Sequence, residues 1–349
     1  MILVLNCGSQ SIKWKLFECK RNSGSGLKLK KQGEANVFDV KNYEKTLIKE
    51  LKKVINYKKD VKVIGHRIVH GGKKFREPTL ITEENLKELK RFNKLAPLHN
   101  PFNVLGVGIA KKIFPNVKQI AVFDTSFYKD LPEKASVYAL PGYIKKEFGF
   151  QRFGFHGISH KFAAKEASKK VKKPFKKLKI ITCHLGGGSS ITAVKNGKAI
   201  DTSMGFTPMA GLLMMTRAGD IDAGIVLQLV ERFSVEKTDE ILNFESGIKA
   251  ICGEKEMLKV LEKARRGDKK AKLALNIFVY KIRKYIGSYY AVLNGCDLLV
   301  FTGTIGYGSL KIRNMVCKNL NILKNTKVLS IKTNEELAIA EEALKCINK

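Results

Sequence analysis

Two stretches of the chain share a pattern in which an apolar run passes through a Gly/Ser turn into a second strand-like run. Residues 2–5 are continuously apolar, residues 7–11 carry glycine and serine, and residues 12–16 alternate apolar side chains with lysine. The same pattern returns at residues 179–194. Short apolar runs and strict alternation are typical of strands, whereas clustered Gly and Ser are typical of turns. We therefore predict a β-hairpin at each place and, from the repeat, two similar domains.

Apolar positions elsewhere recur at helical spacing. Residues 83–95 and 104–114 predict two helices, and residues 119–123 predict a buried strand. A strand at 298–302 leads into a third predicted glycine turn at 302–306. Because strands alternate with helices, we expect an α/β fold. One face of a long predicted helix before the last strand is apolar, with Leu275, Phe278, Ile282, Tyr285 and Tyr289.

The chain is long enough for two domains and contains ample core material. It has 349 residues, of which 44% are hydrophobic and 28% charged, and this composition excludes a disordered chain. No apolar run approaches the ~18 residues of a membrane helix, so we expect no membrane partner and a cytoplasmic location. The seven cysteines are scattered without a C-x-x-C pair, which indicates reduced thiols rather than disulfides or a zinc site.

The chain is strongly basic, with 65 Lys+Arg against 32 Asp+Glu and a formal net charge of +33. Such a charge is compatible with nucleic-acid binding. However, only 11 of the basic residues are arginine, and the densest run, residues 169–179, contains Phe175 as its only aromatic side chain. Base stacking needs aromatic faces. We therefore interpret the charge as a lysine-rich solvated surface and expect no nucleic-acid partner.

Glycine and hydroxyl residues follow a predicted strand at three places: residues 6–11, 185–190 and 302–306. Such turns let backbone N–H groups converge on an anion, because glycine permits close approach. One such turn is ordinarily a plain hairpin, but three together indicate a polyphosphate ligand. Neither a Walker A sequence nor G-x-G-x-x-G is present, so the phosphate cradle would be of another type.

Histidine and arginine supply the candidate chemistry. All six histidines lie between residues 66 and 184. An H-x-x-x-H metal site at 66/70 or 156/160 is an open alternative, although no third ligand lies nearby in the sequence. Arg67 and Arg217 stand out in a chain that uses lysine almost everywhere, which indicates that their planar, bidentate fork matters. The simpler alternative for Arg217 is a structural salt bridge to Asp220 or Asp222.

These residues belong to segments that resemble those of the acetate kinase family, and the resemblance extends over essentially the whole chain. The resemblance implies the actin-like ATPase fold, with two ribonuclease-H-like domains closing over a central cleft. We place these domains at residues 1–125 plus 337–349 and at residues 126–336. The matching segments are 4–13 (VLNCGSQSIK), 65–72 (GHRIVHGG), 95–101 (LAPLHNP), 121–127 (AVFDTSF), 153–160 (FGFHGISH), 182–190 (TCHLGGGSS), 201–208 (DTSMGFTP) and 333–340 (TNEELAIA).

The resemblance also implies an activity, namely reversible phosphoryl transfer from ATP to acetate, giving acetyl phosphate and ADP. Its catalytic residues would be Arg67, Asp124, His156 and Arg217. Asn6 and Glu335 match the positions that hold Mg²⁺ or Mn²⁺. Residues matching the acyl pocket are Val69, Leu98, Phe155 and Pro208, with Arg67 on the carboxylate. Residues matching the donor site are Lys13, His184, Leu185, Gly186, Gly187, Gly188, Gly303, Thr304, Ile305, Gly306, Tyr307 and Gly308. The family also implies a homodimer.

The departures from the family pattern concentrate on the donor side. The usual H-L-G-N-G has Gly187 in place of Asn, and the usual G-G-I-G-E-N has Thr304, Tyr307 and Gly308. The family's S-x-D-x-R has no clear counterpart at residues 253–258, and residues 312–330 form a shorter stretch than usual. Pyrophosphate or another nucleotide as donor is therefore the first alternative. A non-catalytic, nucleic-acid-binding relative is the second.

Overall fold

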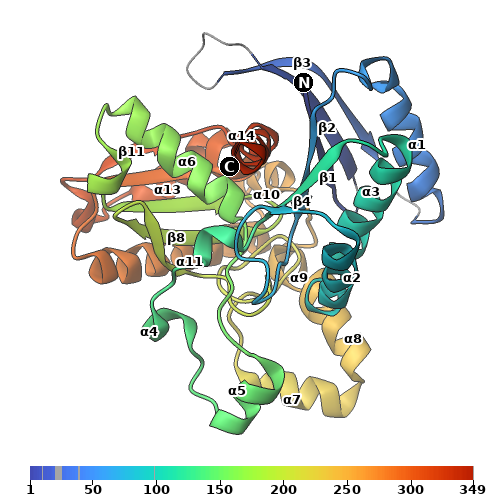
Figure 1. The fold of residues 1–349 in the computed structure, drawn as a ribbon. Coiled ribbons are helices and arrows are strands. Elements are labelled where there is room, and N and C mark those ends of the chain that lie inside the picture. The colour runs from blue at the N-terminus through green and yellow to red at the C-terminus, as the bar shows by residue number, and fades with distance from the viewer. Residues whose placement is uncertain (10, 20–25, 38–39, 98, 349) are drawn as a thin grey trace. The chain divides into compact units, whose positions relative to one another are not determined.

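The computed structural model describes residues 1–9, 11–19, 26–37, 40–97 and 99–348. The chain divides into two compact units (Figure 1). Unit 1 comprises Met1–Lys129 and Asn334–Lys349, and unit 2 comprises Asp130–Thr333. These limits lie close to the predicted domain boundaries. That each unit folds as a domain stays a prediction.

Unit 1 is a mixed sheet with helices on both faces. Its strand order is β3-β2-β1-β4-β6-β5, in which β1 and β2 form the predicted antiparallel hairpin and β4 runs parallel to β1 and β6. The predicted helices and the predicted strand are confirmed as α2, α3 and β6. The elements are β1 (Ile2–Cys7), β2 (Ser11–Cys19), β3 (Leu27–Asn36), α1 (Tyr43–Lys52), β4 (Val63–Ile68), β5 (Thr79–Leu80), α2 (Glu83–Arg91), α3 (Asn100–Ile113), β6 (Lys118–Phe123) and α14 (Glu335–Ile347).

Alternation along the strands decides which side chains meet which helix in unit 1. Leu5 of β1 and Ile64 of β4 belong to the apolar cluster that α1 and α3 cover. The neighbouring positions point the other way, because successive side chains of a strand face opposite sides. Gly65 lies against α14, where an added Cβ would be 2.8 Å from the side chain of Ile339. The face covered by α14 is therefore the one that receives Asn6 and Arg67.

Unit 2 repeats this arrangement with a five-stranded sheet. The order β9-β8-β7-β10-β11 matches β3-β2-β1-β4-β6, and β7 and β8 form the second predicted hairpin. The predicted repeat and the α/β class are confirmed. The elements are α4 (Glu133–Ser136), α5 (Gly142–Phe148), α6 (Gly157–Lys170), β7 (Ile180–Leu185), β8 (Ser189–Lys195), β9 (Lys198–Thr202), α7 (Ala223–Arg232), α8 (Val235–Glu240), α9 (Gly247–Cys252), α10 (Met257–Arg265), α11 (Lys269–Leu293), β10 (Leu298–Thr302), α12 (Gly303–Gly308), α13 (Leu310–Cys317) and β11 (Lys327–Ser330).

The predicted third glycine turn is wrong, because Gly303–Gly308 forms the short helix α12. Ile305 and Gly306 are buried there, whereas Thr304, Tyr307 and Gly308 are exposed. Burial of one side of the segment against β7 and β10 favours a helical turn over an open loop. The glycine content reflects close packing, since an added Cβ at Gly303 would lie 2.5 Å from the carbonyl oxygen of Leu185.

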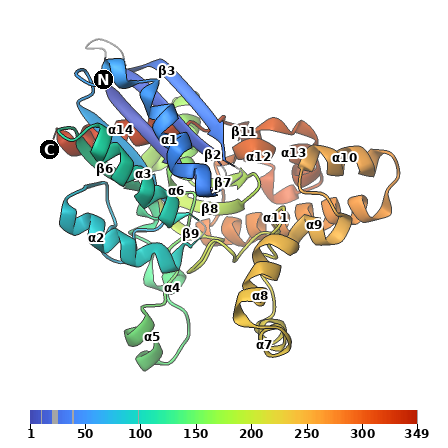
Figure 2. The same cartoon turned by 90° about the vertical axis from the view of Figure 1, so that its right-hand side faces the viewer.

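The two faces of the unit 2 sheet differ in chemistry. Helix α11 packs on β8 and β7, and Figure 2 shows α10 and α13 beside it. This face is apolar, with Cys183, Leu185 and Phe301 in one cluster with Phe278 of α11. Helix α6 packs on β10 and β7. Below it, the alternate positions of β7 and β8 are polar and buried: Thr182, His184, Ser190 and Thr192. Within the described part of the chain, no helix is both long and apolar enough to cross a bilayer.

Candidate active site

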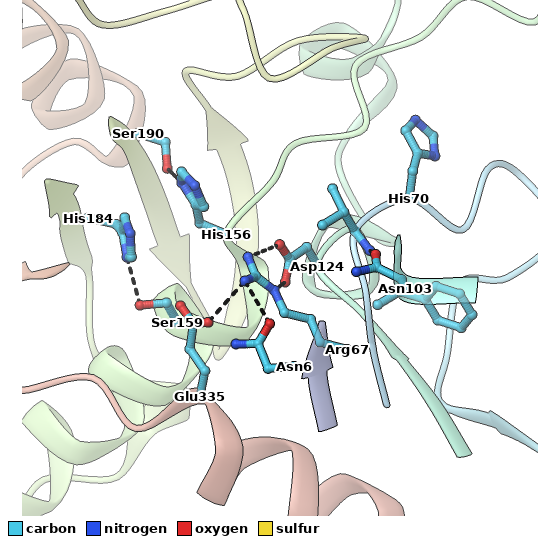
Figure 3. Close-up of polar contacts among 12 residues, drawn as sticks. Asn6, Arg67, His70, Asn103, Asp124, His156, Ser159, His184, Ser190 and Glu335 are labelled. Carbon is cyan, nitrogen blue, oxygen red and sulfur yellow. Dashed lines mark hydrogen bonds and ion pairs between the residues drawn. The ribbon is translucent and has the colours of Figure 1, made fainter. Parts of the chain in front are cut away.

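Arg67 in unit 1 is fixed by a bidentate contact with Asp124. Its Nε donates to Oδ1 of Asp124 at 3.2 Å, and its Nη2 donates to Oδ2 at 2.7 Å (Figure 3). Arg67 lies near the end of β4, and Asp124 directly follows the parallel strand β6. The carboxyl ends of parallel strands meet at one edge of a sheet, which brings these side chains together. Two parallel N–H···O bonds fix the plane of the guanidinium as well as its position.

The two residues predicted to hold a metal ion both contact the guanidinium of Arg67. Nη1 of Arg67 donates to Oδ1 of Asn6 at 3.3 Å and lies 3.5 Å from Oε2 of Glu335. Glu335 is the first residue of α14, and Asn6 belongs to β1. Unit 1 therefore brings together four of the predicted residues: Asn6, Arg67, Asp124 and Glu335.

Two residues that no sequence pattern singled out, Glu336 and Lys15, support this cluster. Oε1 of Glu336 accepts from Nδ2 of Asn6 at 3.4 Å, which turns the amide oxygen of Asn6 toward Arg67. Lys15 Nζ pairs with Glu336 Oε2 at 2.9 Å. Burial alone would raise the pKa of Glu336, but the contact with Lys15 lowers it below its usual value. Glu336 therefore stays charged. The only signal in the sequence is its position beside Glu335.

The electrostatics of the Arg67 cluster keep it charged. Burial alone would lower the pKa of Arg67, but the carboxylates of Asp124 and Glu335 raise it above its usual value.

The amide oxygen of Asn6 and the carboxylate of Glu335 are hard oxygen donors of the kind that Mg²⁺ prefers. Mg²⁺ usually takes only one or two protein ligands and keeps several waters. The donor set therefore fits this ion. Among the described residues, no group of three His, Cys, Asp or Glu could hold a metal ion, so the structure adds no further ligand to the H-x-x-x-H pairs.

Two of the predicted histidines of unit 2 lie face to face beneath α6. The rings of His156 and His184 stack with their centroids 4.3 Å apart. Nδ1 of His156 lies 2.9 Å from Oγ of Ser190, and Nδ1 of His184 lies 2.8 Å from Oγ of Ser159 (Figure 3). His156 caps α6 from the left-handed region, with φ 56°. Few residues other than glycine adopt this conformation, and such strain concentrates at functional sites.

A chain of buried hydrogen bonds links His156 to Ser190, His160 and Thr182. Nδ1 of His160 lies 2.6 Å from Oγ1 of Thr182, and its Nε2 lies 2.8 Å from Oγ of Ser190. Burial and the nearby His184 hold the pKa of His160 well below its usual value, so this ring is neutral. Oγ1 of Thr182 also donates to the Thr192 carbonyl oxygen at 3.4 Å. Nε2 of a neutral His156 carries the hydrogen when the Ser190 hydroxyl donates to its Nδ1.

Arg217 is a half-buried cation with no carboxylate partner among the described residues. Its Nη1 donates to the carbonyl oxygen of Pro208 at 3.3 Å and lies 3.9 Å from Sδ of Met214. Burial lowers its pKa below the usual value. The alternative of a salt bridge is therefore wrong. Asp220 binds Gly211 N and Tyr285 OH, and Asp222 caps α7 by accepting from Gly224 N.

Arg217, His156 and the second glycine turn converge on one point. A Cβ added to Gly188 would lie 3.4 Å from Nε2 of His156 and 3.5 Å from Nη1 of Arg217. Glycine at this position keeps the point open. A half-buried guanidinium that has no carboxylate partner in the described structure and an imidazole nitrogen therefore flank this point, an arrangement that suits an anion.

The rest of the glycine turn is a tight hairpin, and its role as a phosphate cradle stays a prediction. Gly186 N donates to the Gly188 carbonyl oxygen at 3.1 Å, and Gly187 is exposed with nothing within 4 Å of an added Cβ. Leu185 ends β7 and is buried. Oγ1 of Thr304 would lie 3.3 Å from a Cβ on Gly186, so the start of α12 adjoins this turn.

The other predicted donor-site residues are more dispersed. Tyr307 is 43% exposed and helps to line a hollow of about 560 Å³ beside α6. Gly308 is exposed, with nothing within 4 Å of an added Cβ. Lys13, in unit 1, pairs with Glu34 at 3.0 Å. The other residues that line the hollow are Phe162, Glu166, Lys169, Lys170, Ser330, Ile331 and Lys332.

The predicted acyl-pocket residues belong to different units. Val69 of unit 1 is 6% exposed, and its N–H donates to Oδ1 of Asn103 at 3.0 Å. Phe155 of unit 2 is buried, and Pro208 is half-buried with its carbonyl on Arg217. Leu98 lies outside the described residues. The acyl pocket therefore stays a prediction.

Comparison with known proteins agrees with this geometry. The model of the acetokinase family matches residues 1–338. An acetate kinase of Carboxydothermus hydrogenoformans is 42% identical, with 99% of each chain covered. The acetate kinase of Porphyromonas gingivalis superposes with a TM-score of 0.87 at 32% identity, again over 99% of both chains. A propionate kinase of Francisella tularensis has a TM-score of 0.87 at 35% identity and the same coverage.

These similarities, together with the repeated sheet topology, give the chain the actin-like ATPase fold that the resemblance implied. They extend over nearly the full length of both the chain and its relatives. The chain belongs to the acetokinase family.

Proposed function

We propose that the protein is an acetate kinase that transfers the γ-phosphoryl group of ATP to acetate, giving acetyl phosphate and ADP reversibly. The observation that carries the proposal is Arg217, a half-buried cation with no carboxylate partner in the described structure, whose Nη1 and the Nε2 of His156 flank one point beside Gly188. An anion with several oxygens, such as a phosphoryl group, satisfies both donors. The acetate kinases among the relatives support the choice of acceptor.

In the proposed reaction, an oxygen of the acetate carboxylate forms a bond to the γ-phosphorus. The bond from that phosphorus to the β,γ-bridging oxygen breaks, and its electron pair leaves with ADP. No proton needs to move, so catalysis consists of positioning and charge stabilisation. Arg217 and His156 donate to the phosphoryl oxygens as the transferring group flattens. An arginine in this role contributes on the order of 10³-fold or more in rate.

Arg67 has the task of holding the acetate carboxylate. Asp124 fixes the plane of its guanidinium, so that its donors are oriented before the substrate arrives. Val69, Leu98, Phe155 and Pro208 are proposed to surround the methyl group of acetate. Mg²⁺, or Mn²⁺, held by Asn6 and Glu335, would neutralise part of the charge of the donor's phosphates.

ATP is the proposed donor, with Lys13, His184 and residues 185–188 around its phosphates and Gly303–Gly308 near its nucleoside. Thr304 adds a branched side chain next to the Gly186 backbone, and Gly308 lacks a polar group. We therefore expect a high KM for ATP and weak discrimination among nucleotides. The alternative donors are pyrophosphate and other nucleotides, and an assay with each donor in turn distinguishes them from ATP.

The test is acetyl phosphate formation, trapped as hydroxamate, with ATP, GTP or pyrophosphate offered in turn. The proposal predicts product with ATP and a lower KM for ATP in the variant Thr304→Gly combined with Gly308→Asn. An added Cβ at residue 308 meets no atom within 4 Å, so the Asn can be accommodated. If only pyrophosphate gives product, ATP is not the donor. If none of the three donors gives product, the proposed acyl kinase activity is wrong.

We also propose that the protein is a homodimer that works in the cytoplasm, where ATP is available. Helix α7 buries none of its residues, and the segment around it exposes large apolar side chains. Exposed apolar patches of this kind mark interaction surfaces. The α7–α8 patch is defined by Ile225, Leu227, Phe233 and Val235, which are 49%, 70%, 54% and 64% exposed.

A further inference from the structure

Arg217 lies on a loop, residues 211–220, that is closed at its base by one acidic residue. The Asp220 N–H donates to the Gly211 carbonyl oxygen at 2.9 Å, and Oδ1 of Asp220 accepts from the Gly211 N–H at 2.7 Å. Gly219 has φ 74°, and a Cβ there would lie 2.4 Å from the Leu212 carbonyl oxygen. The two ends of the loop are therefore in backbone contact, and small shifts at the base move the whole loop.

The second oxygen of Asp220 is held by a residue from a different element. Oδ2 accepts from the hydroxyl of Tyr285 at 2.6 Å, and Tyr285 belongs to the long helix α11. Its ring packs edge-on against Tyr289, with the centroids 5.8 Å apart. Tyr285 is thus anchored on a packed helix. Asp220 is exposed, and each of its two carboxylate oxygens has a partner within the described structure.

The loop between its closed base and Arg217 is rigid. Met214 N donates to the Arg217 carbonyl oxygen at 3.2 Å, and Met215 N donates to the Gly187 carbonyl oxygen at 3.2 Å. Thr216 Oγ1 donates to the Asn243 carbonyl oxygen at 2.9 Å. A displacement at Asp220 therefore passes through a stiff backbone to the guanidinium and to the glycine turn it faces.

We propose that Tyr285 and Asp220 form a clasp that positions Arg217 for phosphoryl transfer. Neither residue contacts the anion site itself. The clasp acts by holding the loop, so that the Arg217 fork stays within reach of the point beside Gly188. The effect on catalysis rests on the proposed function, whereas the effect on the loop does not.

Tyr285→Phe removes one hydroxyl and keeps the ring, so it tests the clasp with little change in packing. Asp220→Asn is the conservative companion, because its amide oxygen can still accept from Gly211 N. Tyr280→Phe is the matched control, since Tyr280 lies on the same helix and is 61% exposed. Amide hydrogen exchange of residues 211–220 in the full-length protein, followed by mass spectrometry, measures local opening of the loop independently of enzymatic activity.

The clasp predicts that exchange in residues 211–220 becomes about tenfold faster in Tyr285→Phe, less so in Asp220→Asn, and stays unchanged in Tyr280→Phe. It also predicts a kcat about fivefold to tenfold lower with little change in KM, since a contact made in the transition state is misplaced. In an Arg217→Lys background, Tyr285→Phe should add no further loss of kcat.

Unchanged exchange in Tyr285→Phe would overturn the clasp. A loss of kcat that persists undiminished in the Arg217→Lys background would also overturn it, because the hydroxyl would then act independently of Arg217. A parent that forms no acetyl phosphate would overturn the proposed function instead. The exchange comparison would still decide whether Tyr285 holds the loop.

Discussion

Arg67 and Asp124 are 57 residues apart in sequence and share two parallel hydrogen bonds, at 3.2 Å and 2.7 Å. The pair is nearly closed to solvent, since the side chain of Asp124 is 2% exposed and that of Arg67 is 20% exposed. Glu335 and Asn6 approach the same guanidinium from other elements. Arg67 is therefore oriented before any ligand binds.

Asp124→Asn should lower kcat/KM for acetate by about a hundredfold, because one carboxylate partner of a buried guanidinium is lost. The variant keeps the shape of the side chain, and circular dichroism checks its folding. Glu77→Gln is the control, since it removes the carboxylate of a surface pair with Lys129. A folded Asp124→Asn enzyme with the activity of the Glu77→Gln enzyme would show that Asp124 does not orient Arg67 for the substrate.

Val69→Ala should narrow the preference for acetate over propionate. The shorter side chain makes room for one more methylene, and a methylene in an apolar pocket changes discrimination by about 1–3 kcal/mol. The quantity to compare is kcat/KM for the two acids, with Val328→Ala, a valine 42% exposed on β11, as control. If the ratio is the same in parent and Val69→Ala, residue 69 does not line the acyl site.

Stability should fall as the pH drops below about 6.5. Burial lowers the pKa of His66 to about 4, against the opposing hydrogen bond to Gln119. Its stabilising contribution is thus present above the unfolded pKa and is lost as the pH falls toward 4, a change of about 3 kcal/mol. In His66→Gln, the free energy of unfolding should change less with pH, because the titration of His66 no longer contributes. Urea unfolding at pH 7, 6 and 5 measures the free energy of unfolding of parent and variant. An equal loss of stability with falling pH in both proteins would refute the role of His66.

The α7–α8 patch should hold two copies together. The parent is expected to elute at twice 39.1 kDa in size-exclusion chromatography with light scattering. Leu227→Lys should shift the mass toward the monomer, because it places a charge on an apolar interface. Leu258→Lys changes an equally exposed leucine, 72%, on α10 and should leave the dimer intact. A dimer that survives Leu227→Lys would place the interface elsewhere.

The sequence predicted both hairpins and their repeat, because short periodic patterns carry local structure. It also singled out residues that lie together within one unit, such as Arg67 with Asp124 and His156 with His184. It could not predict which face each residue occupies. Arg67 faces α14 and His184 faces α6 only because another helix covers the alternate positions of the same strand. Glu336 and Ser190 were missed for this reason, since their roles arise from contacts across elements.

The alternative weighed for Arg217, a salt bridge to Asp220 or Asp222, fails for a similar reason. Asp220 is near in sequence, which made the alternative worth weighing. Its carboxylate is instead taken by Gly211 N and by Tyr285, 65 residues away. Long-range partners of this kind leave no local signal in a single sequence.

The most direct test of the account is the kcat for acetyl phosphate formation from acetate and ATP, measured for the parent and for Arg217→Lys. Lysine keeps the charge but cannot present two parallel donors, so the account predicts an active parent and a folded variant at least about thirtyfold slower. Arg266→Lys, an exposed arginine beyond α10, should match the parent. A folded Arg217→Lys enzyme within about threefold of the parent would contradict the role assigned to the Arg217 guanidinium.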